Sequence, residues 1–460
     1  MVNPTIFKAY DIRGLYPDEI DEKNIRQITK AIIFFFRKKL GKEDMTVVLG
    51  RDMRISSPSL FEQAKQVLLS MGVHIIDVGL VSTPTFYFAV QSKGYDAGIQ
   101  ITASHNPKDY NGIKFVLRGD QGLIKIGKST GMDEIKTFAT ENDIKDESKS
   151  GKVTEKQGVV TDEVEYALSL LHNPHIAPFN IVADPANAMG ASYIEALFKK
   201  IPGNLIKMNF DLDGTFPSHQ PDPLNFENLK DLQKKVVEEN ADVGLAPDGD
   251  GDRLFFVDEK GQIVPASVIT ALVAREFLKD NPGSTILFDI RYILTPKQII
   301  ESLGGKTAVT KVGHAFITET MGQYDSPFAG ESSAHYFYKA TGNAESQVIT
   351  ILTVLKVMTE TKKPLSQIVQ DLKKSFESGE INFKVSNAQE IIDLLKDKYK
   401  DGDLSLLDGV AISYPSWRFS IRTSNTEPLL RLNLEALDEQ TMNEKKNEVF
   451  ELINAKANLL

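Results

Sequence analysis

Predicted strands and helices alternate along most of this 460-residue chain. An amphipathic helical pattern over 22–40 precedes a β-rich run at 46–49, a helix opens at Ser57, and a further strand follows at 74–78. Such alternation is typical of α/β domains built on a sheet with parallel strands. The chain is too long for one hydrophobic core, so we expect several domains of this kind.

Local signals refine this pattern in three places. The run 6–12 is expected to be a strand, and Asn111-Gly112 is expected to turn the chain into a strand at 113–117, as in a hairpin. Residues 141–157 are rich in Lys, Asp, Glu and Ser with few apolar anchors, so we expect a linker or an exposed loop there.

The organisation changes after Lys362-Lys363-Pro364, where helices precede apolar strands and a closing helix. This part is expected to be a smaller α+β domain, whereas the preceding sequence divides into three α/β units. The predicted domain limits are 1–153, 154–256, 257–366 and 367–460.

Composition excludes several classes of site. The chain has no cysteine, which rules out disulfides, thiolate catalysis and zinc–sulfur centres. Its formal net charge of −10 argues against nucleic acid as the main partner. The longest apolar block, 31–36, is too short to cross a bilayer, and no secretion signal opens the chain, so we expect no membrane partner and a cytoplasmic location.

The acidic loop Asp248–Arg253 carries the most specific chemical signal. It follows an apolar strand and places Asp248, Asp250 and Asp252 at alternate positions, which directs their carboxylates to one side of an extended backbone. Three carboxylates so close together favour a hard divalent cation. Because three Asp ligands leave coordination positions open, Mg²⁺ that also binds a phosphate is the natural occupant.

Two other kinds of structure also contain acidic loops of this kind. A helix-loop-helix calcium site would need a glycine where Arg253 stands, and it would need flanking helices instead of strands. A solvated acidic turn without a metal is the plain structural alternative.

The segment Thr102–Pro107 is the second candidate site. Ser104, His105 and Asn106 offer a hydroxyl, an imidazole and an amide in succession, and the closing proline prevents a helix. The segment follows a predicted strand, and ligands bind at the carboxyl ends of strands in open α/β sheets. A serine beside a histidine is also ordinary turn chemistry, so the segment alone does not decide its role.

Two further loops suit phosphorylated sugars. Arg422–Pro428 combines a guanidinium group, hydroxyls, an amide and backbone N–H groups, which suits a phosphate dianion. Gly330–His335 offers a carboxylate, hydroxyls and an imidazole, a set that can bind sugar hydroxyls. Taken alone, each loop could also be an ordinary polar turn.

These loops, in this order, resemble the α-D-phosphohexomutase family of the phosphomannomutase/phosphoglucomutase type. The matching segments are Ala9–Gly14, Thr102–Pro107 with its continuation Asp109–Lys114, Asp248–Arg253, Gly330–His335 and Arg422–Pro428. The resemblance implies three related mixed-sheet α/β domains and a C-terminal α+β domain of the TATA-binding-protein-like fold, arranged around a central cleft.

The same resemblance implies site roles. Ser104 would be the phosphorylated serine and would join Asp248, Asp250 and Asp252 on Mg²⁺. Arg13, Lys114 and His335 match positions near the transferring group, and either Lys114 or His335 could be the general base. The implied substrate-binding residues are Tyr10, Arg253, Arg291, His314, Glu331, Ser333, Arg422, Ser424, Asn425 and Thr426.

The resemblance implies an enzyme that interconverts hexose 6-phosphate and hexose 1-phosphate. Phosphoserine would give its phosphoryl group to a phosphorylated hexose, and the hexose 1,6-bisphosphate formed would return its other phosphate to Ser104. The segments Ser333–Tyr338 and Trp417–Ser420 favour mannose, with glucose as a second sugar. The alternatives are a phosphoglucosamine mutase, a Mg²⁺-dependent sugar-phosphate phosphatase and a non-catalytic binder. Ser332 and Asn343-Ala344-Glu345 depart from the family pattern, and the sequence does not indicate an oligomeric state.

Overall fold

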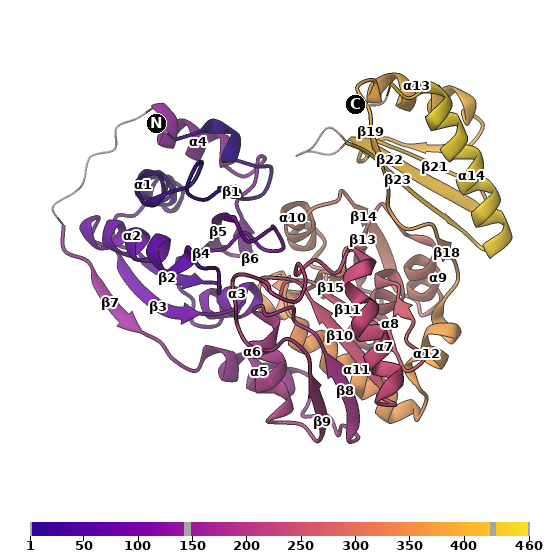
Figure 1. The fold of residues 1–460 in the computed structure, drawn as a ribbon, viewed down its shortest axis with the longest axis horizontal. Coiled ribbons are helices and arrows are strands. Elements are labelled where there is room, and N and C mark those ends of the chain that lie inside the picture. Colours follow the sequence, from indigo (N-terminus) through magenta and orange to yellow (C-terminus); the bar gives the residue numbers. More distant parts are fainter. Residues whose placement is uncertain (1, 142–148, 424–428, 459–460) are drawn as a thin grey trace. The chain divides into compact units, whose positions relative to one another are not determined.

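The computed structural model describes residues 2–141, 149–423 and 429–458 (Figure 1). The chain forms two compact units. The first consists of Met1–Val264 with Ser333–Ile368, and the second consists of Pro265–Ser332 with Val369–Leu460.

The first sheet of the first unit is mixed and has the strand order β1-β5-β4-β2-β3-β7, with β6 paired to β5. Parallel pairing joins β4, β2, β3 and β7, whereas β5 runs antiparallel to β1, β4 and β6. The strands are β1 (Ile12–Leu15), β2 (Thr46–Arg51), β3 (His74–Leu80), β4 (Ala97–Ile101), β5 (Tyr110–Gly119), β6 (Gly122–Lys125) and β7 (Lys152–Glu155).

Four helices accompany this sheet: α1 (Glu22–Leu40), α2 (Ser57–Ser70), α3 (Thr83–Ser92) and α4 (Met132–Glu141). Side chains of β2 alternate between its two faces, as expected for a strand. Val47 and Leu49 enter a core shared with α1, α2 and α4, whereas Val48 enters a core shared with α3. Both faces of the central strands are therefore buried.

Helix α1 confirms the predicted helix at 22–40. The Asp21 side chain caps its start by accepting a hydrogen bond from the backbone N–H of Asn24, and Gly41 ends it in the left-handed conformation with φ 65°. The apolar residues at helical spacing, Ile25, Ile28, Ile32 and Phe36, are all buried.

The predicted turn at Asn111-Gly112 is wrong, because β5 runs through both residues. Gly112 pairs with Arg13 of β1, and a Cβ on Gly112 would lie 2.1 Å from the carbonyl oxygen of Ile12. Glycine is needed here for close approach of two strands, and a glycine of this kind resembles a turn glycine in sequence.

The predictions for 6–12 and 141–157 also need correction. Residues Pro4–Ile6 form a short 3-10 helix (η1), and the strand begins only at Ile12. The apolar residues at 6–12 therefore reflect burial of the segment and not a strand over its whole length. Within 141–157, Lys152–Glu155 form the edge strand β7, parallel to β3. All four residues of β7 are exposed, which explains why the sequence shows no apolar anchor there.

The second sheet of the first unit has the order β12-β11-β10-β8-β9. Antiparallel β10 and β11 pair from Val243 with Asp258 to Pro247 with Leu254, so the acidic loop is the connection within a hairpin. The elements are α5 (Val159–Leu170), β8 (Phe179–Ala183), α6 (Gly190–Phe198), β9 (Gly203–Lys207), η2 (Phe226–Leu229), α7 (Lys230–Glu238), β10 (Val243–Pro247), β11 (Leu254–Asp258) and β12 (Ile263–Val264).

A later segment completes the first unit. Strands β16 (Tyr336–Tyr338) and β17 (Ala344–Glu345) form an antiparallel pair around η3 (Lys339–Thr341). Helix α11 (Gln347–Thr361) follows and is buried over most of its length.

The second unit contains a parallel arrangement in which β13 lies between β14 and β15, and an antiparallel sheet. The first group comprises α8 (Ala266–Asp280), β13 (Thr285–Asp289), α9 (Leu294–Ser302), β14 (Lys306–Thr310), α10 (His314–Tyr324) and β15 (Phe328–Gly330). The second comprises β18 (Phe376–Glu377), β19 (Ile381–Lys384), α13 (Ala388–Lys398), β20 (Asp403–Ser405), β21 (Val410–Ser413), β22 (Trp417–Thr423), β23 (Leu429–Ala436) and α14 (Glu439–Lys456). Helix α12 (Leu365–Leu372) precedes it in the chain.

The observed elements confirm the predicted α/β class with mixed sheets. None of the helices in the described ranges combines the length and the apolar character needed to span a bilayer.

Candidate active site

Ser104 lies just beyond the carboxyl end of β4, where the sequence predicted a ligand-binding position. Its backbone is left-handed, with φ 52°, and its N–H donates to the Thr102 hydroxyl at 3.0 Å. The Ser104 side chain is buried, and its Oγ lies 3.1 Å from Asp248 Oδ2 and 3.2 Å from His105 Nδ1. The serine is therefore in direct contact with the acidic loop.

The acidic loop places three buried carboxylates together. Oxygen atoms of Asp248, Asp250 and Asp252 lie within 4.8 Å of one another. A Cβ at Gly249 would lie 2.3 Å from the carbonyl oxygen of Ser104, so only glycine permits this approach of the two loops. The spacing predicted from the sequence is therefore realised as a compact cluster beside the serine.

Lys114 of β5 places a positive charge in this cluster. Its Nζ lies 2.6 Å from Asp250 Oδ2 and 2.5 Å from Asp252 Oδ2. Burial alone would lower the pKa of Lys114, but the carboxylates of Asp250 and Asp252 outweigh burial and hold this pKa well above its usual range. Lys114 therefore stands as an ammonium ion between two carboxylates.

One lysine does not neutralise three carboxylates. Burial, together with Asp252 and Asp250, raises the pKa of Asp248 to about 8. Among the described residues, none donates a hydrogen bond to the buried Oδ1 of Asp250. An excess of buried negative charge and an oxygen without a donor both fit a divalent metal, whose preferred ligands are such oxygens.

Arg13 reaches the serine loop from β1. Its Nε donates to Asp11 at 2.7 Å, and its Nη1 donates to Asn106 Oδ1 at 2.6 Å. Tyr10 lies partly buried in the segment that leads into β1. The structure thus brings Arg13 to the Ser104 loop.

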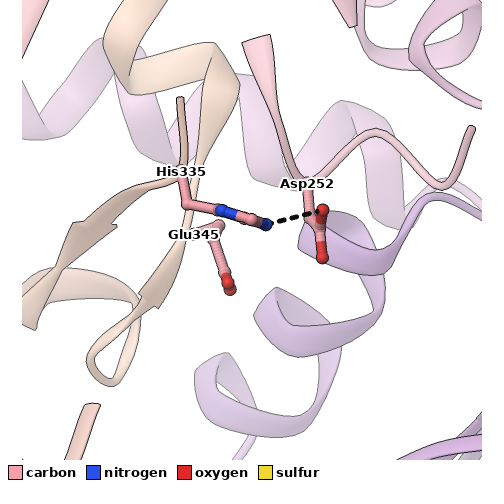
Figure 2. A group of neighbouring side chains, drawn as sticks. All are labelled: Asp252, His335 and Glu345. Carbon is pink, nitrogen blue, oxygen red and sulfur yellow. Dashed lines mark hydrogen bonds and ion pairs between the residues drawn. The ribbon is translucent and has the colours of Figure 1, made fainter. Parts of the chain in front are cut away.

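His335 reaches the acidic loop from the segment before β16 (Figure 2). Its Nε2 lies 3.1 Å from Asp252 Oδ1, and its Nδ1 lies 3.0 Å from the Ser333 hydroxyl. Arg253 lies close by, with Nε 3.4 Å from His335 Nε2. These three predicted residues are therefore gathered with Asp252 in the first unit.

Glu345 is a residue whose position the sequence did not predict. Its carboxylate lies close to His335 and Asp252 (Figure 2) and binds the buried Lys125, with Nζ 2.6 and 2.5 Å from its two oxygens. The rings of Tyr87 and Phe337 lie 4.7 and 4.9 Å from the same ammonium group. The segment 343–345, which departs from the family pattern, thus contains Glu345, the buried counter-ion of Lys125. Sequence spacing could not reveal this pairing.

The second unit holds the remaining predicted residues that the structure describes. Arg291 follows β13, and its Nη2 lies 3.3 Å from Glu331 Oε1. The same oxygen accepts a 3.0 Å hydrogen bond from the N–H of Gly313, which precedes His314 at the start of α10. Arg291, Glu331 and the backbone beside His314 therefore form one polar cluster.

Arg422 lies on β22 directly opposite Arg431 of β23. Arg422 Nη2 and Arg291 Nη1 each lie 3.9 Å from Glu380 Oε2, and Arg431 Nη1 lies 3.4 Å from Glu380 Oε1. Sequence reasoning missed Glu380 and Arg431 because single surface charges carry no specific pattern. Ser424, Asn425 and Thr426, predicted with Arg422, lie outside the described residues.

Four family models match consecutive parts of the chain. Domains I, II, III and the C-terminal domain of phosphoglucomutase/phosphomannomutase match residues 4–144, 164–261, 266–376 and 380–452. The chain belongs to this family. The resemblance drawn from the sequence is confirmed, and with it the class of enzyme, a phosphohexomutase and therefore an isomerase.

Relatives cover essentially the whole chain. A phosphomannomutase of Methanocaldococcus jannaschii is 37% identical over 449 residues, which are 97% of each chain. A phosphomannomutase of Vibrio cholerae is 35% identical over 459 residues, 98% of each chain. The crystal structure of a phosphoglucomutase/phosphomannomutase family protein from Burkholderia thailandensis is 31% identical, covers 100% of both chains and superposes with a TM-score of 0.87.

Replacing Glu345 by glutamine tests the buried pair of Lys125 and Glu345. The E345Q variant keeps the shape of the side chain but leaves the Lys125 ammonium buried without its counter-ion, which costs about 3–5 kcal/mol of folding free energy. Urea denaturation followed by circular dichroism measures this loss. The control is E239Q, which breaks the exposed pair of Lys235 and Glu239 and should cost far less, because solvent screens an exposed ion pair. Equal losses in the two variants would contradict a stabilising role for the buried pair.

Proposed function

We propose that this phosphohexomutase interconverts hexose 6-phosphate and hexose 1-phosphate through a phosphorylated Ser104, with mannose as the preferred sugar and glucose as a second one. The observation that carries the proposal is the 3.1 Å contact between Ser104 Oγ and Asp248 in a loop of three buried carboxylates. A hydroxyl held against such a loop suits reversible phosphorylation better than an ordinary turn does.

The proposed reaction consists of two phosphoryl transfers, each of a different phosphoryl group. In the first step the sugar hydroxyl forms a new P–O bond with the phosphoryl group of phosphoserine, and the bond from phosphorus to Ser104 Oγ breaks. The hydroxyl proton leaves the sugar, and Ser104 Oγ gains a proton, so hexose 1,6-bisphosphate and free serine result. In the second step Ser104 Oγ loses its proton and forms a bond with the other phosphorus, and the bond from that phosphorus to the sugar oxygen breaks. The sugar oxygen gains a proton, so phosphoserine is restored and the isomer is released.

Charge around Ser104 supports this chemistry. Arg13 and Lys114 belong to the strands β1 and β5 beside the serine loop, where cations can stabilise the equatorial oxygens of a transferring phosphoryl group. Lys114 and His335 both contact Asp252. Lys114 is held as an ammonium ion by Asp250 and Asp252 and would first have to lose a proton. His335 is therefore the better proposed candidate for the group that takes the sugar proton.

The acidic loop is proposed to bind Mg²⁺ through Asp248, Asp250 and Asp252, with the phosphate on Ser104 as a further ligand. The donor set consists only of oxygens and leaves coordination positions open, as Mg²⁺ requires. When bound, the metal would neutralise phosphate charge and polarise the Ser104 oxygen.

Other predicted residues are proposed to bind the substrate. Arg422, with Ser424, Asn425 and Thr426, would bind the phosphate that is not transferred, because a guanidinium group matches phosphate geometry. Glu331 and Ser333 would bind sugar hydroxyls. Tyr10, Arg253, Arg291 and His314 complete the proposed substrate-binding set.

The sugar preference is tested by comparing turnover of three substrates. With a trace of hexose 1,6-bisphosphate, mannose 1-phosphate should give mannose 6-phosphate with the highest kcat/KM, glucose 1-phosphate should react more slowly, and glucosamine 1-phosphate should react least. Fastest turnover of glucosamine 1-phosphate would indicate a phosphoglucosamine mutase instead. Inorganic phosphate released without mannose 6-phosphate would indicate a phosphatase.

The carrier role of Ser104 is tested by S104A. Removing the hydroxyl removes the atom that holds the phosphoryl group, so turnover should fall by roughly 10³-fold or more. Intact-protein mass spectrometry after incubation with hexose 1,6-bisphosphate should show phosphorylation of the wild type and none of S104A. Calorimetry should show that S104A still binds mannose 6-phosphate. Turnover at the wild-type rate would exclude Ser104 as the carrier.

The metal assignment is tested by thermal unfolding. Mg²⁺ at about 100 times its Kd stabilises a folded protein that binds it by about 2.7 kcal/mol, so the Tm of the wild type should rise. D250N removes one proposed ligand and should show a much smaller rise, while sodium chloride at equal ionic strength controls for screening. Equal rises in wild type and D250N would contradict binding at this loop.

A further inference from the structure

The Arg54 side chain binds the main chain of the Ser104 loop. This arginine lies shortly after β2, and its side chain is fully buried. Its two terminal nitrogens donate hydrogen bonds to four backbone carbonyl oxygens between β4 and β5. These are Nη1 to Pro107 at 2.7 Å and Tyr110 at 2.9 Å, and Nη2 to Ser104 at 2.8 Å and Asn106 at 2.6 Å.

Neighbouring side chains hold the Arg54 side chain in place. Its Nε lies 3.3 Å from Oδ2 of Asp52, which is also buried and serves as the counter-ion. Asp52 Oδ1 accepts hydrogen bonds from the Arg54 N–H at 3.0 Å and from the Ser57 hydroxyl at 2.5 Å. The ring of Phe216 lies 5.2 Å from the guanidinium carbon. The guanidinium plane is therefore held by a carboxylate and a ring while it binds the loop.

The loop needs such a partner for two reasons. Ser104 has a left-handed backbone, a strained conformation for a non-glycine residue that persists only when the surroundings impose it. Buried carbonyl groups outside a strand ladder also need donors. The carbonyl oxygen of Ser104 accepts a hydrogen bond from Arg54. The same oxygen is the atom that a Cβ on Gly249 would meet.

We propose that Arg54 is a positioning residue for phosphoryl transfer, because its four carbonyl bonds set where Ser104 Oγ stands against the acidic loop. This inference rests on the proposed role of Ser104 as the phosphoryl carrier. Arg54 donates to the backbone and is buried beneath the loop, so it has no part in binding the sugar. Its loss should slow phosphoryl transfer and leave substrate affinity unchanged.

Lysine cannot replace this arginine. A guanidinium group presents five N–H donors in a rigid plane, whereas an ammonium group presents three donors on one nitrogen. The R54K variant keeps the charge beside Asp52 but leaves at least one of the four carbonyls without its donor. Because a displacement of about 1 Å at a reacting group can cost about 100-fold in rate, a loosened Ser104 should react much more slowly.

The test compares R54K with R37K in the full-length protein. Arg37 of α1 is also buried and also donates to a backbone carbonyl, that of Met71, so R37K controls for a generic loss of a buried guanidinium. For each variant kcat and KM are measured with mannose 1-phosphate. The single-turnover rate of Ser104 phosphorylation by hexose 1,6-bisphosphate is measured on samples shown to be folded by circular dichroism.

R54K should lose about 10–100-fold in kcat and in the phosphorylation rate, with KM within about twofold of the wild type. R37K should keep both rates. Wild-type rates in folded R54K would overturn the proposal, and so would equal losses in R54K and R37K. If R54K does not fold, D52N is measured in its place, since this variant removes the charge of Asp52 and keeps Arg54. D52N should likewise lower kcat and the phosphorylation rate while KM stays unchanged, but by a smaller factor. Unchanged rates in D52N would then overturn the proposal.

Failure of this inference is distinguishable from failure of the proposed function. A wild-type protein that hexose 1,6-bisphosphate does not phosphorylate on Ser104 would contradict the function itself. A phosphorylated wild type with equally fast R54K would contradict only the role of Arg54.

Discussion

Mutual repulsion among the three buried carboxylates of the acidic loop is the constraint on which the first unit depends. Oxygens of Asp248, Asp250 and Asp252 lie within 4.8 Å of one another and have little contact with solvent. Such a cluster persists only where positive charge and hydrogen-bond donors meet it, because burial disfavours each ionised carboxyl group. Lys114 from the first sheet, His335 from the segment before β16 and the Ser104 hydroxyl all meet this need. These contacts bring together the groups that we propose to take part in phosphoryl transfer.

In the second unit, several positively charged arginines lie close together. Arg422 and Arg431 face each other across neighbouring strands, and like charges in that position destabilise a sheet unless a counter-ion is near. Burial and then the charge of Arg291 lower the pKa of Arg422, while Asp408 and, to a smaller extent, Glu380 act against both. Arg291, Arg422 and Arg431 lie near the partly exposed Glu380, and Arg291 also contacts Glu331. Such guanidinium groups suit the binding of a dianion. We therefore propose a metal site in the first unit and an anion site in the second.

Much of the fold followed from local sequence signals. The helix at 22–40 and the strands that precede the Ser104 segment and the acidic loop were predicted because hydrophobic period and capping residues act over a few positions. The errors also have local causes. The edge strand β7 has no buried face, and Gly112 serves close strand approach where a turn was expected. Short strands such as β18 and β20 offered too few residues for a period to show.

By itself, the sequence determined the α/β class, the three aspartates at alternate positions and the placement of Ser104 at the end of a strand. These are local properties of a few consecutive residues. Only the tertiary structure decided that Ser104 meets an aspartate 144 positions away, that Glu345 pairs with a lysine 220 positions away, and that Arg54 binds the carbonyls of the serine loop. Such contacts depend on which strand edges and loops the packing of sheets brings together, and no local period encodes that choice.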